Sequence, residues 1–377
     1  MPGSAELAGA VQIGAAEVVV LVLALGAVAL LATGLAASER VPRASAAPRP
    51  DPEEDGVPEP QRRPAVVVNP TKHDDLAQVR ADITAVCTEL GWAEPLWLET
   101  TVDDPGVGQA REAVDAGADV VLACGGDGTV RCVAESLAGT GVPMGLLPAG
   151  TGNLLARNLE LDLDDVAGST RTALTGRDRP VDVGRVRVDD SDEHVFLVMA
   201  GMGFDATIMA NTPEELKARV GPLAYFLSGL RALRGRFARI ALQLDDRPRL
   251  LRRTRTIVVG NCGTLLGGLV LMPAAEVDDG RLDVVSVAPE GILGWLAVVA
   301  RVVTRRQQGH DRVEHWQVES VTLTAAEPQQ AQLDGDPVGR ARVMRMRADQ
   351  GALSVRVPRG EPHPAPESRA GTSGGAG

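Results

Sequence analysis

The stretch DVVLACGGDGTVRCV, residues 119–133, decides the fold of this chain. An uncharged apolar run, Val120–Cys124, passes directly into GGDGT at residues 125–129, and apolar residues then recur at helical spacing. A short apolar run that enters an amphipathic helix through glycines is typical of a buried parallel strand with its covering helix. The stretch therefore predicts a strand, a glycine loop and a helix, in that order.

Two further stretches have the same order of features. AVVV at residues 65–68 is followed by NPT at 69–71, and MGLL at 144–147 is followed by PAGTGN at 148–153. A helical pattern of apolar residues follows each loop. This alternation predicts a Rossmann-like nucleotide-binding α/β domain over residues 65–180. In such sheets ligands bind outside the carboxyl ends of the strands, where all three loops would lie.

The loop at residues 125–129 has the composition of a phosphate site. Backbone amides without side chains at the start of a helix attract anions. Asp127 opposes this, because two like unit charges at about 4 Å repel by roughly 4 kcal/mol at an effective dielectric of about 20. A Mg²⁺ ion reverses the sign, since it binds carboxylate and phosphate oxygens together. We therefore expect Asp127 to contact a metal or its water, and the glycine amides to hold nucleotide phosphates.

The glycine loops match neither common nucleotide-binding spacing. They contain no G-x-x-x-x-G-K-[ST], and GTGNLL at residues 150–155 lacks the third glycine of G-x-G-x-x-G. Taken alone, GGDGT also fits a tight turn in which Asp127 bonds its own backbone. The second glycine loop at 148–153 favours the phosphate interpretation over the simple turn.

Composition limits the classes of partner. The chain has 377 residues, 44% of them hydrophobic, and a formal net charge of -12. Because nucleic acids are bound by basic surfaces, we do not expect nucleic acid as a partner. The four cysteines form no C-x-x-C pair, so the sequence suggests neither a zinc site nor a disulfide framework, and a reducing compartment fits best.

The N-terminal part differs from the rest. Residues 1–17 form a short leading segment, and residues 18–37 are apolar and uncharged. About 20 such residues cross about 30 Å of hydrocarbon as a helix, so we expect a transmembrane helix, with a cleaved signal peptide as the alternative. Five arginines follow the span, and the positive-inside rule then predicts a single-pass protein of the cell membrane with its body in the cytoplasm: Arg40, Arg43, Arg49, Arg62 and Arg63.

The remaining segments are separated by composition. Residues 38–64 are rich in proline, alanine and charge and predict a disordered linker, and residues 359–377 have the composition of a disordered tail. Between residues 181 and 358, short alternating strands are separated by turns of Asp, Gly and Pro. This pattern predicts a second domain, an antiparallel β-sandwich.

Four motifs occur in a characteristic order: GGDGTV at 125–130, PAGTGNLLARN at 148–158, GMGFDA at 201–206 and PAAEVDDGRLDVV at 273–285. Together they resemble the bacterial diacylglycerol kinase catalytic-domain family of lipid kinases, over about residues 64–358. The resemblance implies ATP, Mg²⁺ and phosphoryl transfer to a lipid hydroxyl. The residues expected to bind ATP are Asn69, Pro70, Thr71, Thr100, Gly125, Gly126, Asp127, Gly128, Thr129, Thr151 and Asn153.

The resemblance also assigns two carboxylate clusters in the second domain. Glu276, Asp278 and Asp279 with Gly280 resemble the family's structural metal loop, and a plain Asp-Asp-Gly turn is the alternative. The resemblance implies that Glu276 and Arg281 ligate by backbone carbonyl and Asp279 by its side chain. Where the family has Asp-Gly-Glu with the glutamate as general base, this chain ends the motif in Asp336, which is one methylene shorter. We expect Asp127 and Asp336 to be the catalytic residues, and a hairpin turn at Asp336 is the alternative.

The expected function is phosphorylation of a membrane lipid, diacylglycerol first, with the bilayer as a partner. A basic amphipathic run at 217–239 and an apolar run at 267–272 are candidate lipid contacts, and core packing is the alternative for both. Other acceptors that fit are a sphingoid base, ceramide or another lipid alcohol, and NAD. A nucleotide-binding regulatory protein is the alternative from another class. The oligomeric state is open, with a homodimer among the alternatives.

Overall fold

The computed structural model describes residues 61–203, 237–265, 269–270, 272–288 and 313–359. The chain divides between residues 59 and 60 into two units, and all described residues belong to the second. The predicted linker up to residue 60, the run at 217–236 and most of the tail lie outside the described residues. The described helices are η1 (Pro70–Lys72), α2 (Leu76–Glu89), α3 (Val107–Asp115), α4 (Asp127–Leu137), α5 (Leu154–Asn158) and α6 (Val166–Thr175).

The strands fall into a parallel group and an antiparallel group. The parallel group is β1 (Pro64–Val68), β2 (Leu96–Glu99), β3 (Val120–Gly125) and β4 (Met144–Pro148). The others are β5 (Arg177–Val188), β6 (Glu193–Phe196), β7 (Met199–Met202), β8 (Ala238–Leu244), β9 (Leu250–Thr254), β10 (Thr256–Gly260), β11 (Thr264–Leu265), β12 (Leu269–Val270), β13 (Leu282–Val287), β14 (Val313–Val318), β15 (Ser320–Leu333) and β16 (Asp336–Val357).

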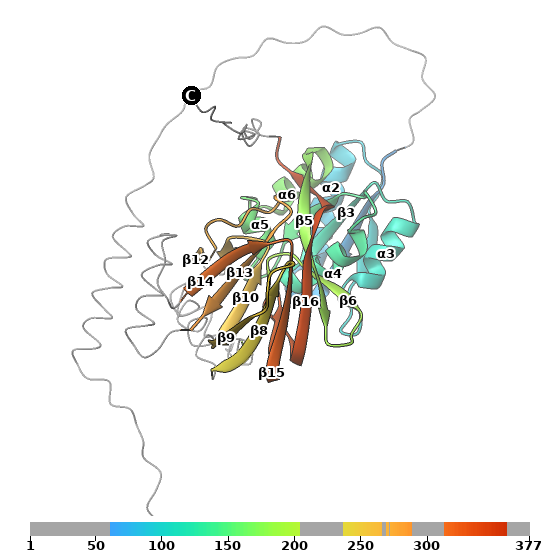
Figure 1. Cartoon of the computed structure of the whole chain (residues 1–377). Helices are drawn as coiled ribbons and strands as arrows, with labels where there is room; N and C mark the ends of the chain where they lie inside the picture. The colour runs from blue at the N-terminus through green and yellow to red at the C-terminus, as the bar shows by residue number, and fades with distance from the viewer. Residues whose placement is uncertain (1–60, 204–236, 266–268, 271, 289–312, 360–377) are drawn as a thin grey trace, which may run out of the picture. The chain divides into compact units, whose positions relative to one another are not determined.

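The parallel strands run in the order β2-β1-β3-β4 and carry helices on both faces (Figure 1). Alternate residues of β1 face opposite cores: Val67 packs with Val133 of α4, whereas Val66 packs with Ile83 of α2 and Leu174 of α6. Burial on both faces explains why these strands are continuous apolar runs. The α/β domain expected from the glycine-loop stretches is therefore present.

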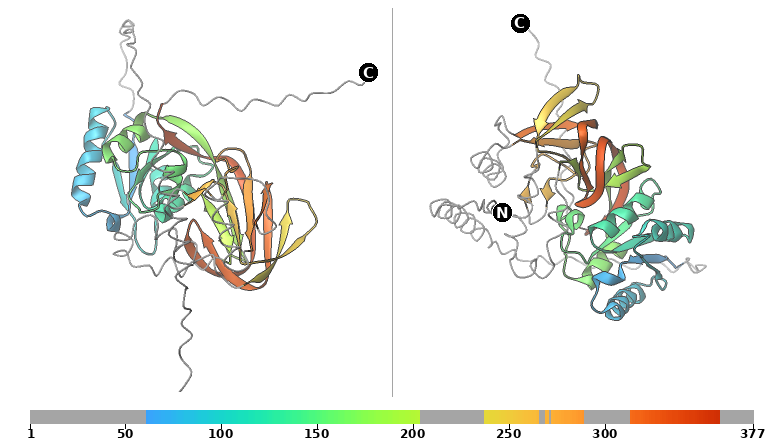
Figure 2. Two further views of the ribbon diagram at one scale, coloured as in Figure 1. Left: turned by 90° about the vertical axis from the view of Figure 1, so that its left-hand side faces the viewer. Right: turned by 90° about the horizontal axis from the view of Figure 1, so that it is seen from below.

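The antiparallel strands form the second, sandwich-like part of the body (Figure 2). Its core contains large side chains from several strands, among them Phe196, Ile240 and Met344. The long strand β16 pairs with β15 and β5, and Val355 near its end pairs in parallel with Met144 of β4. The described strands thus continue from one domain into the other as one 14-stranded sheet, apart from the short pair β11-β12.

The run HVFLVMAG at residues 194–201, whose pattern predicts one strand, contributes to two strands. It breaks between β6 and β7 at Leu197 and Val198, whose backbone amides donate hydrogen bonds to the buried carboxylate of Asp334. At this point the Asp334 side chain, instead of a neighbouring strand, accepts the backbone hydrogen bonds. Hydrophobic alternation does not report such a break, because both residues are apolar and buried.

The expected transmembrane helix and the single-pass localisation are corrected. No helix in the described ranges is long and apolar enough to cross a membrane. The longest of them, α2, has 14 residues and spans about 21 Å, which is short of the roughly 30 Å of a hydrocarbon core. Residues 18–37 themselves lie outside the described part of the chain. The fold class is an α/β domain followed by a sandwich-like β domain.

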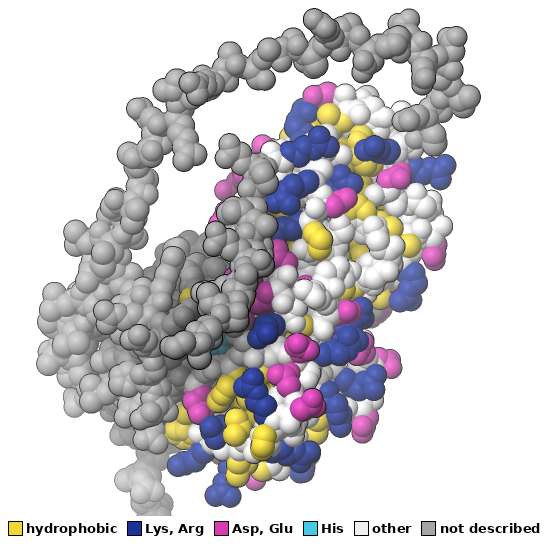
Figure 3. Space-filling view, turned by 45° about the horizontal axis from the view of Figure 1, so that its top comes forward, with side chains coloured by type: hydrophobic (Ala, Val, Ile, Leu, Met, Phe, Trp, Pro, Cys, Tyr) yellow, Lys and Arg dark blue, Asp and Glu magenta, His cyan; other side chains and the backbone are white. Residues whose placement is uncertain are grey.

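The surface has mixed charge on the face shown in Figure 3. Lysine and arginine side chains are interspersed there with aspartate and glutamate.

Two carboxylates cap helices: Asp75 accepts from the amide of Gln78 at the start of α2, and Asp165 accepts from the amide of Gly168 at the start of α6. Such caps stabilise a helix by satisfying amides that lack intrahelical partners.

Candidate active site

The two glycine loops at the ends of β3 and β4 are in backbone contact. The amide of Ala149 donates to the carbonyl of Gly125 at 3.0 Å. A Cβ on Gly150 would lie only 2.7 Å from Cα of Gly126, so residue 150 has no space for a side chain. A Cβ on Gly126 would make an ordinary contact of 3.5 Å with Gly150. The tertiary structure therefore requires glycine at position 150 more strictly than at position 126.

Asp127 joins these loops with both oxygens of its carboxylate. Oδ1 accepts a 2.6 Å hydrogen bond from the amide of Leu154, and Oδ2 accepts one of 3.0 Å from the amide of Asn153. Asn153 is left-handed, with φ of 48°, and its side chain closes the loop onto Gly150 through both its oxygen and its nitrogen. The aspartate of the first loop thus caps α5, which follows the second loop.

The environment of Asp127 makes its negative charge costly. Burial raises the pKa of this carboxyl, the amides of Leu154 and Asn153 lower it, and the charge of Asp336 raises it further. The two carboxyls predicted to be catalytic lie near one another, because Oδ2 of Asp336 would lie 3.1 Å from a Cβ built on Gly128, the residue after Asp127. A cation placed between these two carboxylates and a phosphate would offset the repulsion among the negative charges.

The loop that follows β1 is tied to the GGDGT loop through Asn69. Its Oδ1 accepts from the amide and the hydroxyl of Thr71 at 3.1 and 2.8 Å, and its Nδ2 donates to the buried hydroxyl of Thr129 at 3.4 Å. Pro70 begins η1 directly after Asn69. Thr100 is buried at the end of β2, where its amide donates to the carbonyl of Val68. The predicted nucleotide residues that follow β1 and β3 are therefore in contact.

The turn between β15 and β16 brings Asp336 to this edge. Asp334 and Gly335 take left-handed conformations, with φ of 49° and 93°. The buried Asp334 carboxylate accepts from three successive amides, those of Leu197, Val198 and Met199, at 2.8 to 2.9 Å. Asp336 itself points outward: its side chain is 54% exposed, and its Oδ2 would lie 3.1 Å from a Cβ built on Gly128 of the glycine loop.

Comparison with known proteins agrees with this geometry. Residues 63–186 match the family described as diacylglycerol kinase catalytic domain, and residues 198–357 match the YegS C-terminal NAD kinase beta sandwich-like domain. A Pseudomonas aeruginosa protein named "Probable lipid kinase YegS-like" is 35% identical over 302 residues, which is 76% of this chain and 91% of the relative. The chain belongs to the diacylglycerol kinase catalytic-domain family. It is a lipid kinase, and the family implies the use of ATP.

A second relative matches over a shorter length, and a solved structure shares the fold. A Mycobacterium tuberculosis protein named "Diacylglycerol kinase" is 32% identical over 173 residues, which is 46% of this chain and 56% of that relative. The crystal structure of a Bacillus anthracis diacylglycerol kinase superposes with a TM-score of 0.60 at 18% identity, covering 78% of this chain and 96% of the other. The latter likeness concerns the fold.

The predicted metal loop of this lipid kinase lies against β5 and β16. Oδ1 of Asp279 accepts from the amide of Arg281 at 2.9 Å, and the neighbouring Asp182 accepts from the amides of Gly280 and Gly351. Burial raises the pKa of Asp279 to about 6, and the charges of Asp283, Asp182 and Glu276 add to it. Within the described ranges no group of three metal-binding side chains is assembled, so a metal here stays a prediction.

Two cations near the loops did not emerge from the motifs. The Cε of Lys72, in η1, lies 4.0 Å from a Cβ built on Gly126, which places an ammonium group next to the glycine loop. Arg131 of α4 contacts Asp336 at 3.4 Å. Lys72 could have been found as the first basic residue after NPT, whereas the partner of Arg131 lies 205 residues away in sequence. Thr151 is exposed, and no contact of its side chain is described.

Proposed function

We propose that this lipid kinase transfers the γ-phosphoryl group of ATP to the free hydroxyl of diacylglycerol, giving phosphatidate. The observation that carries the proposal is the position of Asp336: its carboxylate lies beside Gly128, at the first turn of the helix that follows the glycine loop. A base at the loop that binds the phosphates can reach a hydroxyl placed for attack on the terminal phosphorus. The Mycobacterium tuberculosis relative named diacylglycerol kinase supports this choice of acceptor.

The reaction needs one proton acceptor in this arrangement. Asp336 takes the proton of the lipid hydroxyl while that oxygen forms a bond to the γ-phosphorus, and the bond from phosphorus to the β,γ-bridging oxygen breaks, releasing ADP. Because Asp336 is half-exposed, it can return the proton to water after transfer. The buried Asp334 has a different role, since its carboxylate is used by three backbone amides and holds the turn.

The nucleotide would lie along the two glycine loops. Backbone amides of Gly125–Thr129 at the start of α4 suit phosphate oxygens, and the ammonium group of Lys72 adds positive charge. Mg²⁺ neutralises phosphate charge when it accompanies ATP. Each oxygen of Asp127 accepts one amide and keeps a further lone pair, so Asp127 fits as the contact for Mg²⁺ or its water.

A labelling experiment tests the proposal. The purified chain is incubated with ATP labelled at the γ-phosphate, Mg²⁺ and phospholipid vesicles that contain diacylglycerol, ceramide or a sphingoid base in separate reactions, and the lipids are separated by chromatography. We expect labelled phosphatidate from diacylglycerol, with a loss of about 100-fold or more in Asp336→Asn. Asp190→Asn, a matched exposed carboxylate in the turn between β5 and β6, keeps wild-type activity.

Each contrary result has a defined meaning. If ceramide or a sphingoid base becomes labelled and no labelled phosphatidate forms, that lipid is the acceptor instead of diacylglycerol. ATP binding without labelled lipid in any reaction, and still none after Asp336→Glu restores the family's glutamate, would favour a regulatory nucleotide-binding protein.

A further inference from the structure

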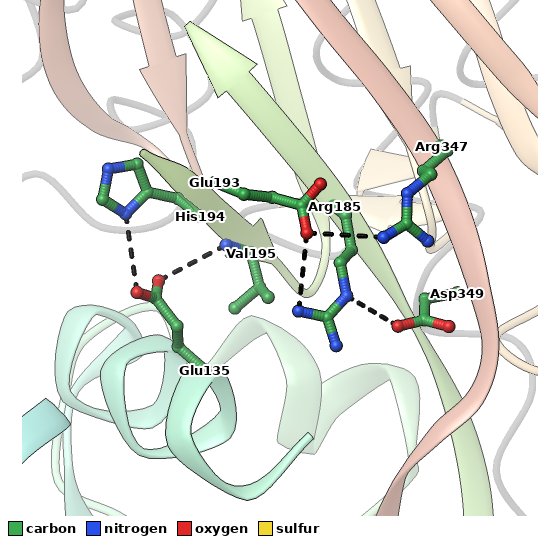
Figure 4. Close-up of polar contacts among 7 residues, drawn as sticks. All are labelled: Glu135, Arg185, Glu193, His194, Val195, Arg347 and Asp349. Atoms are coloured by element: carbon green, nitrogen blue, oxygen red, sulfur yellow. Dashed lines mark hydrogen bonds and ion pairs between the residues drawn. The ribbon is translucent and has the colours of Figure 1, made fainter. Parts of the chain in front are cut away.

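Three charged residues form one stripe on helix α4. Asp127, Arg131 and Glu135 are spaced four residues apart, so their side chains lie above one another on the same face. Asp127 holds the start of α5. Glu135 reaches the second domain, where it accepts from the amide of Val195 at 3.4 Å and lies 3.5 Å from the ring of His194 (Figure 4). Arg131 lies between these two fixed points.

Arg131 has few partners for a largely buried cation. Its side chain is 14% exposed, and its one side-chain hydrogen bond within the described residues is the 3.4 Å contact from Nη2 to Oδ2 of Asp336. Its Nε is buried and has no partner in the described part of the chain. An arginine that serves packing alone commonly uses several donors of its planar fork, because an unpaired buried donor costs about 1–3 kcal/mol. Its charge also interacts with that of the buried Asp334, but the Asp334 carboxylate is already bound by three backbone amides. The carboxylate that Arg131 hydrogen-bonds is that of Asp336, so we look for its role there.

Asp336 depends on this contact in turn. The backbone of its turn is fixed by the buried Asp334, but this leaves the rotation of the Asp336 side chain free. In the described residues, Arg131 is the one group that hydrogen-bonds to that carboxylate. A base that is one methylene shorter than the family's glutamate has less reach, so its orientation matters more.

We propose that Arg131 is a positioning residue that turns the Asp336 carboxylate toward the acceptor hydroxyl. The inference rests on the proposed function, because it assumes that Asp336 is the base. The stripe on α4 then links nucleotide and base: the helix that begins at the phosphate loop also carries the cation that orients the proton acceptor.

Steady-state kinetics with diacylglycerol vesicles test this role. We expect Arg131→Met to lower kcat by about ten- to hundred-fold, with the KM for ATP changed by less than about three-fold. Arg131→Lys, which keeps the charge, should recover at least about a third of the wild-type kcat. The double variant Arg131→Met, Asp336→Asn should be no slower than Asp336→Asn alone, since a positioning residue has nothing left to position.

Controls separate this role from stability. Arg185→Met breaks a comparable contact, the 2.6 Å pair with Asp349 on the neighbouring strand, and should leave kcat unchanged (Figure 4).

A raised KM for ATP at constant kcat would overturn the inference and make Arg131 a nucleotide contact. So would wild-type kcat in Arg131→Met, or additive losses in the double variant. If Arg131→Met does not fold, Arg131→Lys decides, and a kcat as low as that of Asp336→Asn overturns the inference. Wild-type protein that labels no lipid would instead reject the proposed function itself.

Discussion

The backbone amide of Leu154 donates a 2.6 Å hydrogen bond to the carboxylate of Asp127, so the aspartate of one glycine loop caps the helix that follows the other. The same carboxylate accepts from the amide of Asn153. Asp127 is thus both a structural link and a negative charge at the predicted phosphate site. Substitutions there remove both properties, which can be separated by measuring stability and activity independently.

Asp127→Ala should lose activity far beyond its loss of stability. It removes the acceptor for two amides at the start of α5, which we expect to lower the unfolding free energy by about 1–2 kcal/mol. It also removes the charge that would interact with Mg²⁺, and kinase activity should fall by at least about 100-fold. Denaturant unfolding and the lipid-labelling assay measure the two effects.

Asp165→Ala is the matched control for Asp127. Asp165 caps α6 through the amide of Gly168 at 2.9 Å, away from the glycine loops. Its replacement should cost about 1 kcal/mol of stability and leave the specific activity of the folded protein unchanged. Equal losses of activity in both variants would show that Asp127 acts through stability alone.

Two glycine substitutions should differ in their effect on stability. Gly150→Ala places a Cβ 2.7 Å from the backbone of Gly126, and backbone cannot move aside, so we expect a loss of about 1–3 kcal/mol. Gly126→Ala makes only a 3.5 Å contact, and the protein should melt within about 2 °C of wild type. Circular dichroism during heating gives both values, and a similar melting temperature for the two variants would contradict the loop contact.

The Gly126→Ala variant also reports on phosphate binding. Since it should fold normally, a fall in ATP affinity measured by calorimetry can be assigned to the methyl group at the loop surface. We expect an approximately ten-fold weaker Kd, because a phosphate that approaches the amides of this loop would meet the new Cβ. Unchanged affinity would place the phosphates elsewhere.

Asp334 should make stability depend on pH. Burial raises the pKa of this carboxyl to about 6, although three backbone amides lower it. Because the pKa in the folded protein lies above the unfolded value of about 3.9, the stabilisation is fully present below pH 3.9 and is lost as pH rises through 6. Wild type should therefore lose about 2 kcal/mol from this group between pH 4 and pH 7.5.

The Asp334→Asn variant isolates that group, because it does not titrate. The substitution changes the hydrogen bonds at this site by an amount that does not vary with pH. The unfolding free energy of the variant relative to wild type should therefore rise by about 2 kcal/mol between pH 4 and pH 7.5. Urea unfolding of both proteins at the two pH values measures this difference. A relative stability that does not change with pH would show that Asp334 is ionised throughout.

Divalent cations should stabilise the chain through the predicted metal loop. Asp279 lies among the charges of Asp182, Asp283 and Glu276, and a cation there would relieve their repulsion. At Ca²⁺ or Mg²⁺ concentrations of about 100 times Kd, bound metal adds about 2.7 kcal/mol to the unfolding free energy. The melting temperature of wild type at pH 7.5 should rise with added cation and fall with chelator.

Asp279→Asn provides the control for the metal loop. It should melt at the same temperature with and without cation, whereas Asp278→Asn should still respond, because Asp278 is paired with Arg179 at 2.9 Å. A wild-type protein whose melting temperature is insensitive to both cation and chelator would rule out the predicted site.

What the sequence determined by itself is the local structure. Buried parallel strands must be apolar throughout, and their covering helices repeat apolar residues at helical spacing, so β1, β3, β4, α2 and α4 can be predicted from short windows of sequence. The glycine loops follow from the same windows, because glycines between a strand and a helix leave the amides at the start of the helix open. The family resemblance then supplied the kind of chemistry.

Only the tertiary structure decided which of these residues meet. Asp127 reaches Leu154 across 27 residues, Arg131 reaches Asp336 across 205, and Asp334 interrupts an apolar run to form β6 and β7. Such contacts depend on how the sheet continues through β16 from one domain into the other, and packing over long sequence separations leaves no periodic pattern. An apolar stretch of suitable length at residues 18–37 predicted a membrane helix, whereas no helix in the described ranges, which exclude that stretch, is long and apolar enough to span a bilayer.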